Sequence, residues 1–137
     1  LAMRKKDGMT EEISDLAGLS QTRPGIAAAL AVFMFSLAGI PPLAGFFGKF
    51  YVFLSAINAG LIGLAVVGVV TSVIGAYYYL RIVKIMYFDE PTTEFEKPMG
   101  REMGVILAAS AVFTALFVLY PSPVVESAAA AAAALTP

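Results

Sequence analysis

The residue with the clearest capacity for chemistry is a single lysine inside a long uncharged stretch. Lys49 is the only charged residue between Arg23 and Arg81, and phenylalanines lie on both sides of it. In a helix that crosses a membrane it would lie about 14 Å from Asn58, near the middle of the hydrocarbon core. A cation at that depth costs roughly 3 kcal/mol, so such residues normally face a protein interior or a water-filled cavity.

The chemistry open to this lysine is reversible proton transfer. Desolvation favours the neutral amine over the ammonium ion, and an amine close to neutrality can both accept and release a proton. We therefore predict that Lys49 is a proton-relay group, a role that needs no cofactor. The alternative is a structural lysine whose flexible stem carries the charge to the membrane surface.

A double proline, Pro41-Pro42, lies shortly before Lys49 and must interrupt the helix there. Each proline lacks a backbone N–H, and its ring clashes with the preceding turn, so a regular helix cannot pass through. Backbone groups released at membrane depth have to be satisfied by protein or by water, which is why broken membrane helices line cavities. We predict a helix break formed by Gly39, Pro41, Pro42, Gly45 and Gly48.

The composition indicates that these residues lie in a membrane protein. Of the 137 residues, 59% are hydrophobic and 14% are charged, whereas an ordinary soluble domain has about 25% charged residues. Three runs carry no charge at all, namely Gly25–Gly48, Phe50–Leu80 and Met103–Val125. Since about 20 apolar residues in a helix cross a bilayer, the sequence predicts an all-α membrane protein.

The first hydrophobic segment, residues 24–58, is too long for one straight span, so it is either a hairpin of two half-length helices or one broken span. The two layouts distribute Lys and Arg differently. A single crossing places eight of them on one face and none on the other, with Lys49 inside, whereas a hairpin divides them four and four. Because cytoplasmic loops carry an excess of Lys and Arg, we expect three transmembrane spans, the first of them discontinuous.

The predicted organisation alternates charged loops with membrane spans. We expect the N-terminal loop to be cytoplasmic and the C-terminus to lie outside. The segments are a cytoplasmic loop at 1–23, a broken transmembrane helix at 24–58, a transmembrane helix with a cytoplasmic extension at 60–88, a cytoplasmic loop at 89–101, a transmembrane helix at 102–120 and an alanine-rich C-terminal tail at 121–137. Residues 127–135 of this tail form either a short helix or a frayed end.

Several classes of site are excluded by residue types that the chain lacks. It has no Cys and no His, which removes disulfides, haem, iron–sulfur clusters and the usual zinc and copper sites. Its net charge of −1 gives no indication of nucleic-acid binding. The chain begins at Leu1 with no signal-peptide pattern, so we expect it to be a piece of a longer polypeptide.

Two motifs carry a resemblance to a known family. The block LAGIPPLAGFFGKF at Leu37–Phe50, followed by GAYYYLR at Gly75–Arg81, resembles the antiporter-like membrane subunits of the proton-pumping NADH–quinone oxidoreductase, respiratory complex I. The lysine at position 49 and the tyrosine triplet after it are similar to subunit N, whereas subunit M has a Glu at the place of the lysine. The strong resemblance covers about Asp15–Pro91.

The resemblance implies that the chain is a C-terminal fragment of a fourteen-helix fold built from inverted repeats, with 24–58 as the broken twelfth helix and Lys49 as its axis lysine. The implied role is to couple quinone reduction to proton transfer across the bacterial inner (plasma) membrane. NADH, flavin, iron–sulfur clusters and quinone would belong to other subunits. This chain would hold no cofactor and no metal, and it would be inactive alone. The implied partners are the other membrane subunits, the lipid bilayer, protons and water.

Three other functions stay open at this point. A subunit of a multisubunit sodium/proton antiporter would have similar helices. A non-catalytic membrane scaffold would carry Lys49 only as a residue that reaches the membrane surface. A photosynthetic-type relative would take its electrons from ferredoxin instead of NADH.

Overall fold

Helices form most of the described part of the chain in the computed structural model, which describes residues 4–5, 8–9, 12–91 and 100–135. Two short 3₁₀ helices, η1 (Ile13–Leu16) and η2 (Phe117–Leu119), precede α1 and follow α5. The predicted helical class is thereby confirmed. The α-helices are α1 (Leu19–Thr22), α2 (Pro24–Ala38), α3 (Ala44–Asn58), α4 (Ile62–Phe88), α5 (Arg101–Leu116) and α6 (Ser122–Leu135).

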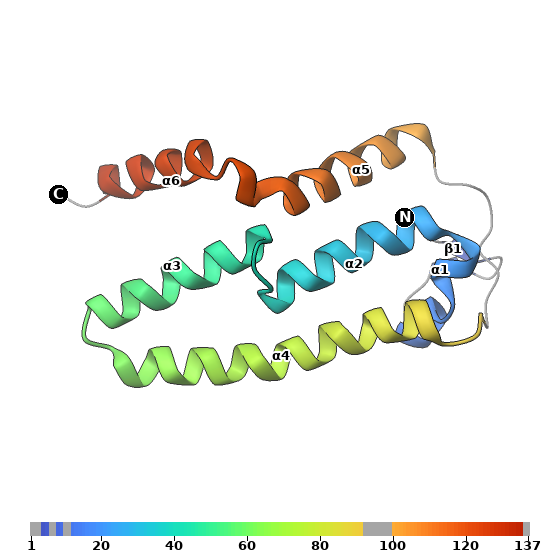
Figure 1. Cartoon of the computed structure of the whole chain (residues 1–137), viewed down its shortest axis with the longest axis horizontal. Helices are drawn as coiled ribbons and strands as arrows, with labels where there is room; N and C mark the ends of the chain where they lie inside the picture. Colours follow the sequence, from blue (N-terminus) through green and yellow to red (C-terminus); the bar gives the residue numbers. More distant parts are fainter. Residues whose placement is uncertain (1–3, 6–7, 10–11, 92–99, 136–137) are drawn as a thin grey trace.

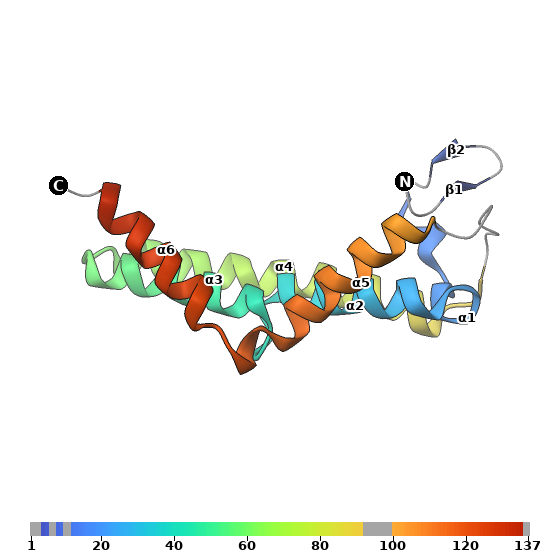
Figure 2. The same cartoon turned by 90° about the horizontal axis from the view of Figure 1, so that it is seen from above.

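The region predicted as an N-terminal loop contains two short strands that the sequence did not indicate. β1 (Arg4–Lys5) pairs antiparallel with β2 (Gly8–Met9), and Arg4 lies opposite Met9. Figure 2 shows this pair at the end of the molecule where α1 lies and α5 begins. The strands are therefore far from the interruption between α2 and α3.

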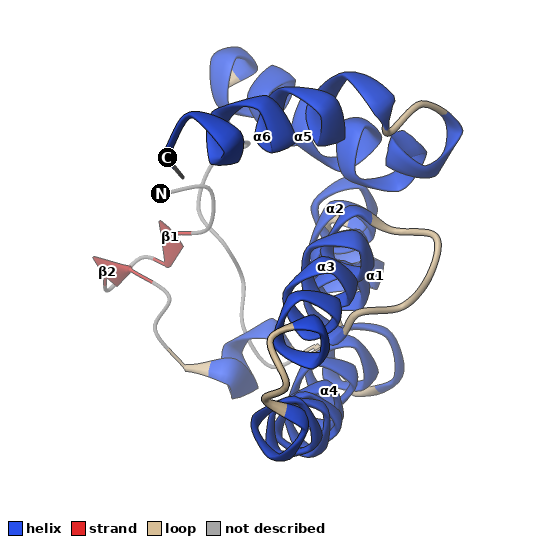
Figure 3. Ribbon diagram, turned by 90° about the vertical axis from the view of Figure 1, so that its left-hand side faces the viewer, coloured by secondary structure: helices blue, strands red, loops and turns tan. Residues whose placement is uncertain are grey.

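The long helices are arranged as a row with the interrupted pair in the middle. Helices α2 and α3 lie end to end and run in the same direction, while α4 runs antiparallel to both (Figures 1 and 2). Helix α5 packs on the other side of α2 from α4 (Figure 3). The interruption between α2 and α3 therefore lies at the centre of the row, beside the middle of α4.

The tightest packing lies where α1, α2 and α4 meet. Leu19 and Met86 are completely buried there, against Ile26, Ala27 and Ala31. The two alanines allow the helices to approach closely, because small side chains keep backbones near each other. This cluster holds the first half of the interrupted pair against α4.

The outer faces of α4 and α5 are apolar instead of polar. Leu64 on α4 is 63% exposed and Val105 on α5 is 68% exposed. By length and composition, α4 and the segment Arg101–Leu119 could each cross a membrane, and only 6% of the most apolar 18-residue stretch of each is buried. Such surfaces suit lipid or neighbouring helices better than water.

The helix boundaries follow local backbone chemistry. Helix α4 begins at Ile62, two residues after the predicted start, because Gly60 has a φ of 77° and ends the preceding helix. The tail, for which a helix or a frayed end was open, forms α6.

The described residues exclude 92–99, so most of the loop predicted at 89–101 lies outside them, as do 1–3, 6–7, 10–11 and 136–137. The sidedness of all these segments stays a prediction.

Candidate functional site

Helix α2 ends in a turn that leaves one of its last carbonyl groups open. Gly39 has a φ of 86°, in the left-handed region, and its N–H donates to the Ser36 carbonyl over 3.0 Å. The N–H of Ile40 donates to the Phe35 carbonyl over 3.1 Å. These two bonds form the Schellman pattern of a helix C-terminus. Neither bond uses the carbonyl of Leu37.

The side chain of Lys49 reaches this carbonyl from the other half of the interrupted pair. Its Nζ donates a hydrogen bond to the Leu37 carbonyl oxygen over 2.6 Å. The carbonyl end of a helix carries partial negative charge, which stabilises a nearby cation. Lys49 therefore caps α2 although it belongs to α3.

Helix α3 begins just after the interruption and has no cap from its own side chains. Leu43 precedes it and forms no side-chain cap hydrogen bond. The N–H of Gly45 donates instead to the hydroxyl oxygen of Ser36 on α2, over 2.9 Å. Among the described residues, two hydrogen bonds thus cross the break, one to a backbone acceptor of α2 and one to a side-chain acceptor of α2.

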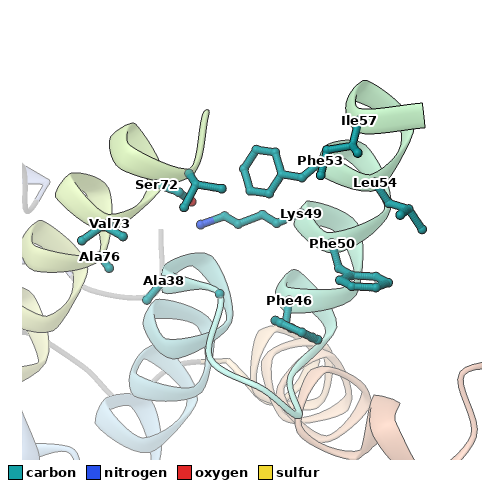
Figure 4. Close-up of a pocket in the computed structure, with 12 residues that line it drawn as sticks. Ala38, Phe46, Lys49, Phe50, Phe53, Leu54, Ile57, Ser72, Val73 and Ala76 are labelled. Atoms are coloured by element: carbon teal, nitrogen blue, oxygen red, sulfur yellow. The ribbon is translucent and has the colours of Figure 1, made fainter. Parts of the chain in front are cut away.

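Lys49 also lines a pocket of about 400 Å³ between α3 and α4. Figure 4 shows its amine between Ser72 of α4 and Ala38 at the end of α2. Ser72 is the only other polar side chain among the described residues of the lining, and the rest is apolar or aromatic. The α3 residues of the lining are Phe46, Lys49, Phe50, Phe53, Leu54 and Ile57.

The amine of Lys49 has N–H donors that the described chain does not use. Within residues 12–91 and 100–135, the Leu37 carbonyl is the one hydrogen-bond acceptor recorded for it, and no carboxylate forms an ion pair with it. A protonated amine has three N–H donors, so two remain for water or for groups outside the described chain. Across the same ranges, no group of three or more His, Cys, Asp or Glu could hold a metal ion.

The other predicted site residues divide between the interruption and the first turns of α3. Pro41 and Pro42 lie in the segment that joins α2 to α3. A Cβ at Gly39 would lie 3.2 Å from Cδ of Lys49, and a Cβ at Gly45 would overlap the Ser36 carbonyl oxygen. Gly48 lies one turn into α3, and a Cβ there would meet open space in the described structure. Gly39 and Gly45 therefore take part in the contact between the two helices, and Gly48 does not.

The sequence places Ser36 among the hydroxyl residues that could bond across helices, with a packing role favoured for it, and it gives no indication of the Leu37 carbonyl. Ser36 lies three residues before Gly39, in the last turn of a helix that the double proline must end. That position was the available signal, since a hydroxyl there can reach across a break. A serine inside a helix more often bonds to the backbone of its own helix, so its residue type alone does not single it out.

Comparisons with known proteins agree on one family. Residues 1–75 match a family described as NADH:quinone oxidoreductase/Mrp antiporter, TM. Relatives named NADH-quinone oxidoreductase subunit N from Parvibaculum lavamentivorans and Rhodospirillum rubrum are 58% and 61% identical, over 100% and 99% of this chain. The chain spans 28% of the length of each of these relatives.

A solved structure is similar to the chain as well. It is respiratory complex I from Thermus thermophilus with bound Aureothin, in which one chain gives a TM-score of 0.70 at 35% sequence identity. The match covers 80% of the present chain and 26% of that chain. The likeness therefore extends over most of the helices described above.

Proposed function

The chain belongs to the NADH:quinone oxidoreductase/Mrp antiporter transmembrane family, and from this premise we propose that it is part of a proton-translocating membrane subunit of NADH–quinone oxidoreductase. The relatives named above carry the name of subunit N of that enzyme. The resemblance carried by the Leu37–Phe50 block is confirmed at this level. Within the subunit, we assign the transfer of protons to the site around Lys49.

The observation that carries the assignment is the hydrogen bond from Lys49 to the open carbonyl of Leu37. When the amine takes up a proton from water, the bond becomes charge-assisted and the negative end of α2 stabilises the new charge. When the amine releases the proton, it keeps N–H groups that can still donate to the same carbonyl. Lys49 can therefore cycle between two protonation states without leaving its position.

The membrane layout supports the same role. Helices α2 and α3 have 15 residues each, or about 22 Å each, which is too short for a span alone. Because they lie end to end (Figure 1), we propose that they cross as one discontinuous span, with the Lys49 site near mid-membrane. Helix α4 and the segment Arg101–Leu119 are the second and third spans, with the N-terminal loop cytoplasmic and the C-terminus outside a bacterial inner membrane.

The redox chemistry of such an enzyme has to lie outside this chain. NADH, flavin, iron–sulfur clusters and quinone would be bound by other subunits, which are the partners we propose for it. The chain spans 28% of its relatives, so it would act only within the whole subunit and the whole complex. On its own it would be inactive.

The test is to replace Lys49 in the complete complex by alanine and by arginine. We expect both variants to lose most NADH-driven proton pumping, since alanine has no titratable group and arginine does not release its proton. Oxidation of NADH by an artificial acceptor should be unchanged, which shows that the redox subunits are assembled. Lys84→Ala is the matched control, because Lys84 is an exposed cation near the end of α4. Normal pumping in both Lys49 variants would refute the assignment.

A second function is favoured by the family description, which also covers Mrp antiporters. Here the same lysine would carry protons in exchange for sodium, without any redox partner. Membrane vesicles that contain the whole protein distinguish the two functions. A sodium gradient that drives proton movement in the absence of NADH supports the antiporter, and pumping that requires NADH supports the oxidoreductase.

A further inference from the structure

Ser36 is a polar side chain in an unusual position at the end of α2. It is 8% exposed, and it is the only buried polar or charged side chain among the residues whose burial the structure describes. A buried hydroxyl in an apolar bundle needs a hydrogen-bond partner, because an unsatisfied polar group is costly there. Its partner is the N–H of Gly45 on the next helix.

The bond to Gly45 satisfies a donor that α3 cannot satisfy itself. The first N–H groups of a helix have no partner inside that helix, and Gly45 is the second residue of α3. Ordinarily a polar side chain at the residue before the helix accepts such a bond, but Leu43 occupies that position. Ser36 performs this function from the preceding helix and thereby ties the start of α3 to the end of α2.

The contact is too close for any other residue at position 45. A Cβ added at Gly45 would overlap the carbonyl oxygen of Ser36 and would lie 2.9 Å from its hydroxyl oxygen. The absence of a side chain therefore allows the two backbones to meet at this one register. We call the pair Ser36 and Gly45 the clamp.

The clamp lies next to the proton-relay site on both helices. Ser36 directly precedes Leu37, and Gly45 lies four residues before Lys49, on the same face of α3. Because Gly45 is held on Ser36, the position of Lys49 relative to the Leu37 carbonyl is fixed as well. In this register Nζ donates to that carbonyl over 2.6 Å.

We propose that Ser36 is a positioning residue that holds Lys49 on the Leu37 carbonyl, the position from which Lys49 transfers protons. The inference rests on the function proposed above for Lys49. In the described structure, the helices around the Lys49 pocket place no second charged side chain beside the amine. Lys49 is the only charged residue of α2 and α3, and the α4 residues that line the pocket, Val69, Ser72, Val73 and Ala76, are uncharged.

The experiment compares Ser36→Ala, Ser36→Thr and Lys49→Ala in the complete complex. Proton pumping is measured over a range of pH, and the amount of the variant subunit in the purified complex reports its assembly. Ser36→Ala should lower pumping roughly tenfold, because the N–H of Gly45 loses its hydrogen-bond acceptor. It should also change the pH profile of pumping, because the amine is no longer held on the Leu37 carbonyl. Ser36→Thr keeps the hydroxyl and should restore both properties.

Ser55→Ala is the matched control, since Ser55 is an exposed serine of α3 away from the break, and it should pump like the native complex. If Ser36→Ala does not assemble, Ser36→Cys, which keeps the size but accepts hydrogen bonds weakly, is measured in its place. An unshifted pH profile in the assembled variant would overturn the positioning role, whatever the pumping rate. If Lys49→Ala pumps normally, the proposed function of Lys49 fails instead. If Lys49→Ala is inactive and Ser36→Ala is native-like, only the inference about Ser36 fails.

Discussion

The amine of Lys49 and the carbonyl of Leu37 lie 2.6 Å apart although they belong to different helices. The bond places a titratable side chain of α3 on the negative end of α2. A change in the charge of Lys49 therefore changes the strength of a contact that joins the two helices. In the function proposed for Lys49, this relationship would connect proton uptake to the geometry of the interruption.

Gly39→Ala should destabilise the interruption and weaken proton transfer. Gly39 has a φ of 86°, and a non-glycine residue in the left-handed region costs roughly 1–2 kcal/mol. The new methyl group would also lie 3.2 Å from Cδ of Lys49 and push its stem away from Leu37. We expect a lower half-inactivation temperature and a loss of pumping in the purified complex. Native values of both would contradict the geometry described at the end of α2.

Alanine at Gly45 and alanine at Gly48 should have opposite consequences. At Gly45 the methyl group would overlap the backbone carbonyl of Ser36, whereas at Gly48 it would meet open space in the described structure. Gly48→Ala is therefore the control, and it should stabilise α3 by up to about 1 kcal/mol, because alanine favours a helix interior. The half-inactivation temperature measures both effects. Equal behaviour of the two variants would show that the helices do not meet at Gly45.

A cysteine at position 49 should react with a small water-soluble thiol reagent. The chain has no native cysteine, so mass spectrometry of its peptides identifies the modified site. Lys49 lines a pocket of about 400 Å³, which has room for water. Ala27→Cys is the matched control, since Ala27 is 0% exposed in the packed region of α2, and it should stay unmodified. Protection of Lys49→Cys in the complete complex would indicate a dry site that cannot exchange protons.

The proposed sidedness can be tested with two further cysteines. Glu90 follows the end of α4, and Ser127 is an exposed residue of α6. With three spans, they lie on opposite sides of the membrane. An impermeant reagent should therefore label Glu90→Cys only in inside-out vesicles and Ser127→Cys only in right-side-out vesicles. Labelling of both from the same side would rule out the three-span layout.

Much of the architecture could be predicted from the sequence because it depends on covalent and solvation properties of single residues. Proline has no backbone N–H, so Pro41 and Pro42 cannot lie inside a continuous helix. Long uncharged runs form helices whose outer faces suit lipid, and the confirmed helical class and the family both follow from such local patterns. Lys49 was singled out for the same kind of reason, since a cation is costly in an apolar stretch.

Only the tertiary structure decided which groups meet at the interruption. The acceptor of Lys49 is a backbone carbonyl, which every residue possesses, so residue types do not reveal that it belongs to Leu37. The bond between Ser36 and Gly45 likewise depends on how closely α2 and α3 approach, end to end, beside α4. Hydrogen bonds between elements depend on distance and direction in space. Local sequence rules describe neither, so these contacts could be found only once the helices were packed.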